Sequence, residues 1–157
     1  MSDAAVAAEG RTHEFTTQSG ADTIAVGRKL AELLKPPQLV LLRGELGTGK
    51  TTLVKGIAQA LGAAEPNEVT SPTFTLIHEF AGTRKGKPVK LYHLDVYRLE
   101  SERQLETLGL DDLLTPDALV VVEWGEKFKS ISKRATGEIR IVFEGGDARK
   151  IMVTLKE

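Results

Sequence analysis

Residues 38–62 read QLVLLRGELGTGKTTLVKGIAQALG, and this stretch decides the fold class. It starts with a short apolar run bounded by turn residues, which is typical of a strand buried on both faces of a parallel sheet. The segment GELGTGKT at 44–51 matches the pattern G-x-x-x-x-G-K-S/T completely. A helical pattern then begins at Lys50 and ends near Gly62, a typical C-cap residue. The order of strand, glycine-rich loop and helix predicts a P-loop domain that binds the phosphates of a nucleotide.

The residues of this loop have separate expected roles. Glycines let the backbone amides approach the phosphates, and Lys50 supplies a positive charge to the β and γ oxygens. The Thr51 hydroxyl is expected to bind Mg²⁺, and Thr52 to contact the α-phosphate. The expected phosphate-binding residues are Gly44, Glu45, Leu46, Gly47, Thr48, Gly49, Lys50, Thr51 and Thr52.

The base of the nucleotide is predicted by exclusion. GTPases of this fold generally recognise guanine through an Asn-Lys-x-Asp motif, whereas this chain has a single asparagine, Asn67, followed by Glu68. The sequence therefore argues against GTP and leaves ATP, with Mg²⁺, as the expected cofactor. No residue pattern identifies adenine directly.

Two strand patterns end in a carboxylate, which a P-loop site requires for Mg²⁺. LVVVE ends at Glu123 and LYHLD ends at Asp95. The four apolar residues before Glu123 are typical of a central parallel strand, whereas the mixed residues before Asp95 follow a predicted hairpin and indicate a less buried position. This pattern favours Glu123 as the magnesium ligand and leaves Asp95 to orient the attacking water or a switch segment. The structural alternatives are a helix cap or ion pair at Glu123 and an ion pair between Asp95 and Arg98.

Composition limits the other classes of function. The chain has 157 residues, with 21 Lys and Arg against 22 Asp and Glu, and no Cys. This charge balance is unlike that of a strongly basic nucleic-acid-binding protein, and the lack of Cys excludes disulfides and thiolate metal sites. No apolar run approaches the roughly 18 residues of a membrane span. We expect a cytoplasmic protein with no membrane contact, in which any RNA contact is local or shared with a partner.

The rest of the chain alternates helical and strand patterns. A helical pattern covers 22–34, two strand patterns flank the turn at 81–88, and an acidic helical region covers 101–114. Two alternating runs around GGD near the C-terminus predict a hairpin. These patterns predict an α/β fold of the P-loop NTPase type, with three layers, a central mixed and mostly parallel sheet and a C-terminal β-hairpin. We expect residues 1–11 to be a flexible N-terminus and 12–157 to form a single P-loop ATPase domain.

Four segments together resemble a known family. They are GELGTGKTT at 44–52, TSPTFTL at 70–76, HLDVYR at 93–98 and VVEW at 121–124. In this order they are similar to the bacterial TsaE (YjeE) family of small ATPases. The resemblance spans roughly residues 15–155, and the SPTFTL and H-x-D-x-Y-R segments are much more specific than the P-loop.

The resemblance implies a function and partners. Proteins of this family take part in making N6-threonylcarbamoyladenosine beside the anticodon of tRNAs that read codons beginning with adenine. They bind and hydrolyse ATP while docked to TsaD-like and TsaB-like proteins, and they do not transfer the threonylcarbamoyl group themselves. A contact with tRNA is then expected only through these partners.

The resemblance also implies roles for single residues. Thr51 and Glu123 match the family's magnesium positions, and Asp95 matches its second essential acid. Thr73 lies in the segment 71–74, which is likened to a GTPase switch that senses the γ-phosphate. The expected catalytic residues are therefore Lys50, Asp95, Glu123 and Thr73, and the expected metal ligands are Thr51 and Glu123.

A few positions carry weaker expectations. Many relatives have Pro where this chain has Gly125, which is expected to loosen that loop, and Arg149 is the nearest match to a late arginine that lies near the nucleotide in some members. The resemblance points to residues 19–23 for the adenine ring. Trp124 is expected to pack between elements. His93 lacks the spacing of a metal ligand, although its place in the family motif allows an orienting role.

Two other functions are compatible with the P-loop. A small-molecule kinase uses the same phosphate cradle, but the chain shows no lid insertion with several arginines. A nucleotide-regulated binding module would bind ATP without meaningful turnover. Phosphate release without an acceptor argues against the kinase, and stimulation of that release by partners argues for the ATPase.

Overall fold

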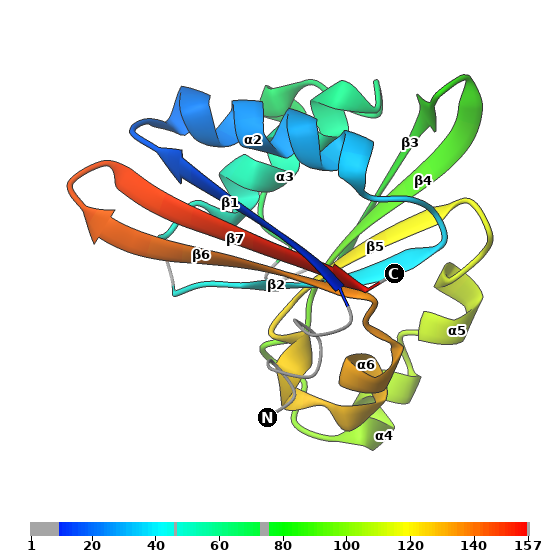
Figure 1. The fold of residues 1–157 in the computed structure, drawn as a ribbon. Helices are drawn as coiled ribbons and strands as arrows, with labels where there is room; N and C mark the ends of the chain where they lie inside the picture. Colours follow the sequence, from blue (N-terminus) through cyan, green and yellow to red (C-terminus); the bar gives the residue numbers. More distant parts are fainter. Residues whose placement is uncertain (1–9, 46, 73–75, 157) are drawn as a thin grey trace.

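The computed structural model describes residues 10–45, 47–72 and 76–156, and Figure 1 shows its fold. In this described part of the chain, one sheet of seven strands has the order β1-β7-β6-β2-β5-β4-β3. The strands are β1 (Gly10–Thr17), β2 (Gln38–Arg43), β3 (Ile77–Arg84), β4 (Lys87–Asp95), β5 (Ala118–Glu123), β6 (Gly137–Gly145) and β7 (Ala148–Lys156). The α-helices are α2 (Gly20–Leu33), α3 (Lys50–Ala60), α4 (Glu102–Glu106), α5 (Leu110–Leu113) and α6 (Lys129–Arg134). Two short 3-10 helices are η1 (Pro66–Glu68) and η2 (Gly125–Lys127).

The centre of the sheet is parallel and its two sides are antiparallel. Strands β6, β2, β5 and β4 run parallel, whereas β3 on one side and β7 and β1 on the other pair antiparallel. Every residue of β5 is buried, as expected for an apolar strand with a neighbour on each edge. The predicted mixed sheet with a parallel centre and a C-terminal hairpin is confirmed. Because carboxyl ends of parallel strands meet at one edge, the register places Asp95 opposite Glu123.

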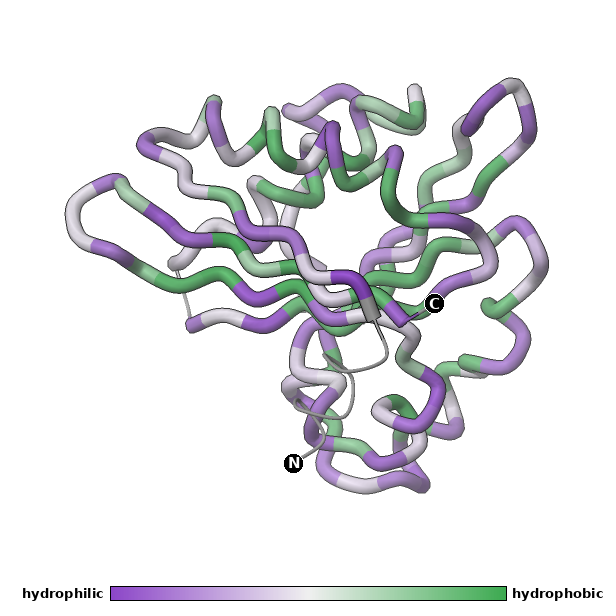
Figure 2. The backbone as a smooth tube through the Cα atoms, in the orientation of Figure 1, coloured by the Kyte–Doolittle hydropathy of each residue, from purple (hydrophilic) through white to green (hydrophobic). Residues whose placement is uncertain are grey.

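Helices cover both faces of the sheet, with α2 and α3 on one side and α4, α5 and α6 on the other (Figure 1). Successive residues of β5 point to opposite faces, so Val121 packs in a cluster with Leu30 and Ile57, and Val122 packs in a cluster with Leu105 and Ile131. Figure 2 shows hydrophobic residues along the central strands and the helices above them, and hydrophilic residues at the tip of the β3–β4 hairpin. The predicted three layers are therefore confirmed.

Two glycines let α2 and α3 cross in direct backbone contact. A Cβ added at Gly27 would collide with the Leu53 carbonyl oxygen, and one at Gly56 would collide with the Ile24 carbonyl oxygen. A real Cβ at either position requires the helices to move apart. This close crossing fixes α3, the helix whose first residue is Lys50, against the rest of the fold.

Two elements of the fold differ from the sequence prediction. Strand β1 begins at Gly10, so Gly10 and Arg11 pair with β7 instead of belonging to a loose N-terminus. The acidic region 101–114 forms two short helices, α4 and α5, because Gly109 between them has a left-handed backbone with φ 67°. Among the described helices, none has the length and apolar character needed to cross a membrane.

Candidate nucleotide site

The P-loop connects the carboxyl end of β2 to the first residue of α3. Gly47 and Gly49 have positive φ values of 80° and 109°, a backbone conformation that glycine adopts without a steric cost. Gly49 is the N-cap of α3, and the Thr48 hydroxyl donates to the Glu45 carbonyl oxygen at 2.7 Å. The Thr48 hydroxyl also lies 2.7 Å from where a Cβ at Gly44 would be. The glycines are thus required by the turn itself, and the turn presents the amino end of α3 as an anion site.

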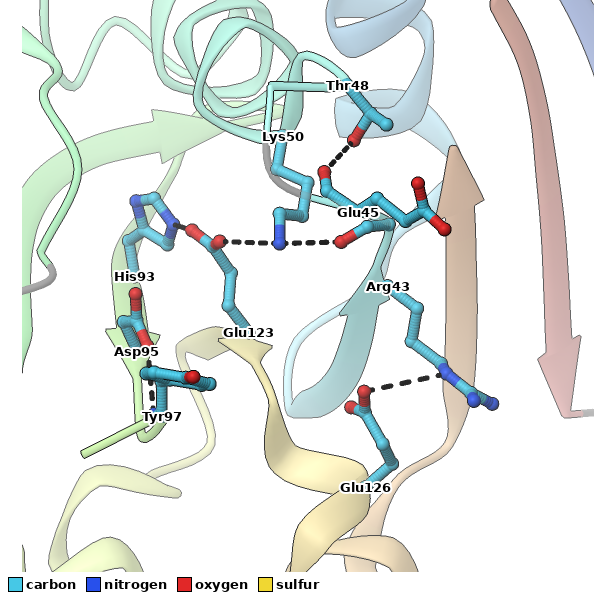
Figure 3. Close-up of polar contacts among 10 residues, drawn as sticks. Arg43, Glu45, Thr48, Lys50, His93, Asp95, Tyr97, Glu123 and Glu126 are labelled. Carbon is cyan, nitrogen blue, oxygen red and sulfur yellow. Dashed lines mark hydrogen bonds and ion pairs between the residues drawn. The ribbon is translucent and has the colours of Figure 1, made fainter. Parts of the chain in front are cut away.

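Lys50 lies at the centre of the site (Figure 3). Its side chain is buried, and its Nζ donates to the Gly44 carbonyl oxygen at 2.8 Å. The same Nζ lies 3.4 Å from Glu123 Oε1 and 5.1 Å from the centroid of the Trp124 ring. The residue thus connects the P-loop to the end of β5, the arrangement that its predicted role on the phosphates requires.

Glu123 is buried and contacts the side chains of His93 and Lys50. Its Oε2 lies 2.6 Å from His93 Nε2, while its Oε1 faces Lys50. Burial raises the pKa of Glu123, but the hydrogen bond and charge of His93 and the charge of Lys50 outweigh it, so the pKa lies below its ordinary value of 4.5. Glu123 is therefore ionised at neutral pH, as a magnesium ligand must be.

Asp95 is as buried as Glu123, which corrects the sequence prediction of a less buried position. The exposed fractions are 5% for Asp95 and 4% for Glu123. The prediction was wrong because β4 is flanked by β3 and β5, and the second half of the strand, residues 91–95, is buried throughout. Asp95 Oδ1 accepts a hydrogen bond from the Tyr97 amide at 2.9 Å.

The backbone of Asp95 connects to the threonine-rich segment. The Asp95 amide donates to the Leu76 carbonyl oxygen at 3.0 Å, and the Leu76 amide donates to the Pro72 carbonyl oxygen at 2.8 Å. Leu76 has a positive φ of 70°, which is uncommon for a branched residue and marks a strained turn. Thr73 and Phe74 lie outside the described residues, as does Leu46 of the P-loop. Leu76, the last residue of the TSPTFTL stretch, is thus bonded to Asp95 on one side and to Pro72 of the predicted switch segment on the other.

The remaining predicted residues also lie around the P-loop. Thr51 and Thr52 are half-buried in the first turn of α3. Arg149, the loosely matched late arginine, donates from Nε to the Thr48 carbonyl oxygen at 3.0 Å. Thr23 lies near Gly49, because its Cγ2 would be 3.9 Å from a Cβ added at Gly49. The chain therefore brings together residues that are widely separated in the sequence.

The loop after Glu123 is tightly packed. Trp124 has φ 67°, and its ring lies 4.9 Å from that of Tyr97, an exposed aromatic residue that sequence reasoning gave no role. Gly125 is buried, and a Cβ there would lie 2.8 Å from Ile131 Cγ2 and 2.9 Å from Leu41 Cδ2. The packing thus gives no support to the expectation that Gly125 loosens this loop, and it confirms Trp124 as a contact between elements.

Size does not single out this site among the hollows of the molecule. A hollow of about 570 Å³ beside the P-loop is lined by Gly44, Thr48 and Trp124, among others. Two hollows of about 500 and 490 Å³ lie at the opposite end of the fold, near the last turn of α2. The site is identified by the chemistry of Lys50 and Glu123 and not by the volume of its hollow.

Comparisons with known proteins identify the family of this chain. The family model described as threonylcarbamoyl adenosine biosynthesis protein TsaE matches residues 17–151. The tRNA threonylcarbamoyladenosine biosynthesis protein TsaE of Aquifex aeolicus (strain VF5) is 40% identical over 116 residues, which cover 74% of this chain and 79% of that protein. The protein of the same name from Bacillus subtilis (strain 168) is 36% identical over 141 residues, which cover 90% and 84%. The crystal structure of Bacillus subtilis YdiB matches with a TM-score of 0.67 and 30% identity, covering 94% of this chain and 88% of that one. This chain therefore belongs to the TsaE family.

Proposed function

We propose that this protein is a Mg²⁺-dependent ATPase that is required to form N6-threonylcarbamoyladenosine in tRNAs that read codons beginning with adenine. Membership of the TsaE family supports a role in this pathway, because relatives that are 36% to 46% identical are named tRNA threonylcarbamoyladenosine biosynthesis proteins. One observation carries the ATPase proposal. Lys50, at the start of the P-loop helix, meets Glu123 at the end of the neighbouring parallel strand.

Each residue of the site has a proposed part in hydrolysis. The amides of the P-loop and Lys50 bind the β and γ phosphates and stabilise the charge that develops there. A water oxygen attacks the γ-phosphorus while the bond from phosphorus to the ADP oxygen breaks. We assign Asp95 to orient this water or the segment that contains Thr73, because the backbone of Asp95 is hydrogen-bonded to Leu76, which follows that segment and bonds to Pro72 within it.

Thr51 and Glu123 are the proposed holders of magnesium. A hydroxyl and a carboxylate are hard oxygen donors, which suit Mg²⁺, and this ion commonly takes one or two protein ligands together with phosphate and water. When bound, the ion would neutralise charge on the β and γ oxygens. The pKa of Glu123, lowered by His93 and Lys50 in spite of burial, keeps the carboxylate ready for this role.

The proposed partners are TsaD-like and TsaB-like proteins, and the protein would meet tRNA only through them. We propose that the chain acts as a single ATPase domain over residues 12–157, that it works in the cytoplasm, and that its turnover is slow without partners. The support for these points is the family alone.

A gene replacement tests the proposed function. A Lys50→Ala copy should lower N6-threonylcarbamoyladenosine in bulk tRNA, measured by mass spectrometry, because phosphate binding is lost. A Lys133→Ala copy is a suitable control, since Lys133 is an exposed lysine of α6. An unchanged level of N6-threonylcarbamoyladenosine in the Lys50→Ala strain would contradict the proposed role in tRNA modification. Release of phosphate by the purified protein without any acceptor would separate the ATPase from a small-molecule kinase.

A further inference from the structure

His93 lies on β4, an interior strand of the sheet next to the edge strand β3, beside the two acids of the site. Its exposed fraction is 0%, and it pairs with His78 of β3 on one side and Val121 of β5 on the other. Side chains two residues apart on a strand point to the same face. His93 and Asp95 therefore share one face of β4, and the register places Glu123 diagonally across from His93 on that face.

The two oxygens of the Glu123 carboxylate have different partners, His93 and Lys50. Oε2 is 2.6 Å from His93 Nε2, whereas Oε1 is 3.4 Å from Lys50 Nζ, on the P-loop side. Figure 3 shows the imidazole and the lysine on opposite sides of the carboxylate. With one oxygen fixed by a ring that cannot move far in a packed sheet, the rotation of the carboxylate is fixed as well.

A histidine that serves only to fill the core does not fit this position well. The Nδ1 atom of His93 is buried and has no hydrogen-bond partner among the described residues. A buried polar atom without a partner costs free energy, whereas an apolar side chain of similar size avoids that cost. In the described part of the chain, the polar contact of the His93 side chain is thus the bond to Glu123, a residue of the site.

We propose that His93 is a positioning residue, which holds Glu123 through Oε2 and so directs Oε1 toward the phosphates and their magnesium. This inference rests on the proposed function. His93 acts through Glu123 and does not touch the nucleotide or the metal. Residues that orient a metal-binding side chain in this way typically change metal affinity by 10-fold to 100-fold when they are replaced.

Three replacements of His93 separate positioning from packing. Gln reaches about as far as the histidine Nε2 and can donate the same hydrogen bond, Asn has a donor that stops short of Oε2, and Leu has no donor. His78 is the matched control, because it is the cross-strand partner of His93 and its ring faces Phe80, 6.3 Å away between centroids. We would measure the affinity of each full-length protein for a fluorescent ATP analogue, with Mg²⁺ and with EDTA.

The positioning role predicts a loss that appears only with magnesium. His93→Leu and His93→Asn should lose roughly 10-fold of the affinity gained from Mg²⁺, with little change in EDTA. His93→Gln and His78→Leu should keep most of the affinity that the wild type gains from Mg²⁺. If the Leu variant does not fold, the comparison of Asn with Gln carries the test.

Three results would overturn the inference. The first is that the Asn and Leu variants gain as much affinity from Mg²⁺ as the wild type does. The second is that these variants lose equal affinity with and without Mg²⁺, which would indicate a packing role. The third is that the wild-type protein binds the ATP analogue with the same affinity in Mg²⁺ and in EDTA. A wild type that does not bind ATP at all instead defeats the proposed function, and the inference fails with it.

Discussion

The carboxyl ends of β4 and β5 carry two acids, Asp95 and Glu123, that have similar positions and burial in the sheet but different hydrogen-bond partners. Asp95 and Glu123 are opposite each other in register, and their exposed fractions are nearly equal. Glu123 contacts the side chains of His93 and Lys50, whereas Asp95 bonds to the backbone of Tyr97 and, through its own amide, to that of Leu76. Burial therefore does not decide which acid serves the metal. We assign the metal to Glu123 because Lys50 of the P-loop contacts its carboxylate, and we assign Asp95 to the neighbouring segment because its amide is bonded to Leu76.

The largest expected effect follows from the replacement of Asp95. Asp95→Asn should lower kcat for ATP hydrolysis about 100-fold, the usual size for a group that orients or deprotonates the attacking water. Its affinity for Mg-ATP should change little. Steady-state phosphate release and equilibrium nucleotide binding measure the two quantities. A loss confined to magnesium-dependent binding would exchange the roles of the two acids.

Glu123→Gln should have a smaller effect, and on binding. The amide keeps the size of the side chain but loses the charge that Mg²⁺ requires, so the affinity gained from Mg²⁺ should fall roughly 10-fold or more. Titrations of nucleotide with Mg²⁺ and with EDTA give this quantity. Glu126→Gln is a suitable control, because Glu126 lies in the next turn and pairs with Arg43 at 3.7 Å. Equal losses in both variants would point to a general charge effect.

A third variant tests how tightly the helix crossing holds α3, the helix that begins at Lys50. Gly56→Ala forces α2 and α3 apart, because its Cβ would meet the Ile24 carbonyl oxygen. We expect a loss of about 1–3 kcal/mol in the free energy of unfolding, measured by denaturant titration. Gly20→Ala is the control, since a Cβ at Gly20 meets no described heavy atom within 4 Å. An unchanged stability of Gly56→Ala would show that the crossing is looser than the structure indicates.

The smallest expected effect is a pH dependence. The pKa of Glu123 lies below 4.5 in the folded protein, because His93 and Lys50 overcome the effect of burial. The ionised carboxylate therefore stabilises the fold fully above pH 4.5, and this contribution is lost as the pH falls through the folded pKa. Gln at this position does not titrate. The stability of the wild type relative to Glu123→Gln should thus decline below pH 4.5 in denaturant titrations, and a rise there would contradict the lowered pKa.

The sequence predicted the parts of the site that depend on neighbouring residues. The P-loop and its flanking strand and helix form one contiguous segment, and LVVVE predicted a fully buried strand because its pattern is local. The burial of Asp95 was mispredicted because it depends on the pairing of β4 with both β3 and β5. The contact between His93 and Glu123 spans 30 positions of the chain. The place of His93 in the family motif allowed an orienting role but did not identify Glu123 as its partner.

The position of the metal tests the assignment of the two acids most directly. Crystals grown with a non-hydrolysable ATP analogue and Mn²⁺ in place of Mg²⁺ would locate the ion by its anomalous scattering. We predict an ion beside the Thr51 hydroxyl, closer to Oε1 of Glu123 than to either carboxyl oxygen of Asp95. An ion closer to Asp95, with Glu123 still bonded to Lys50, would contradict the account.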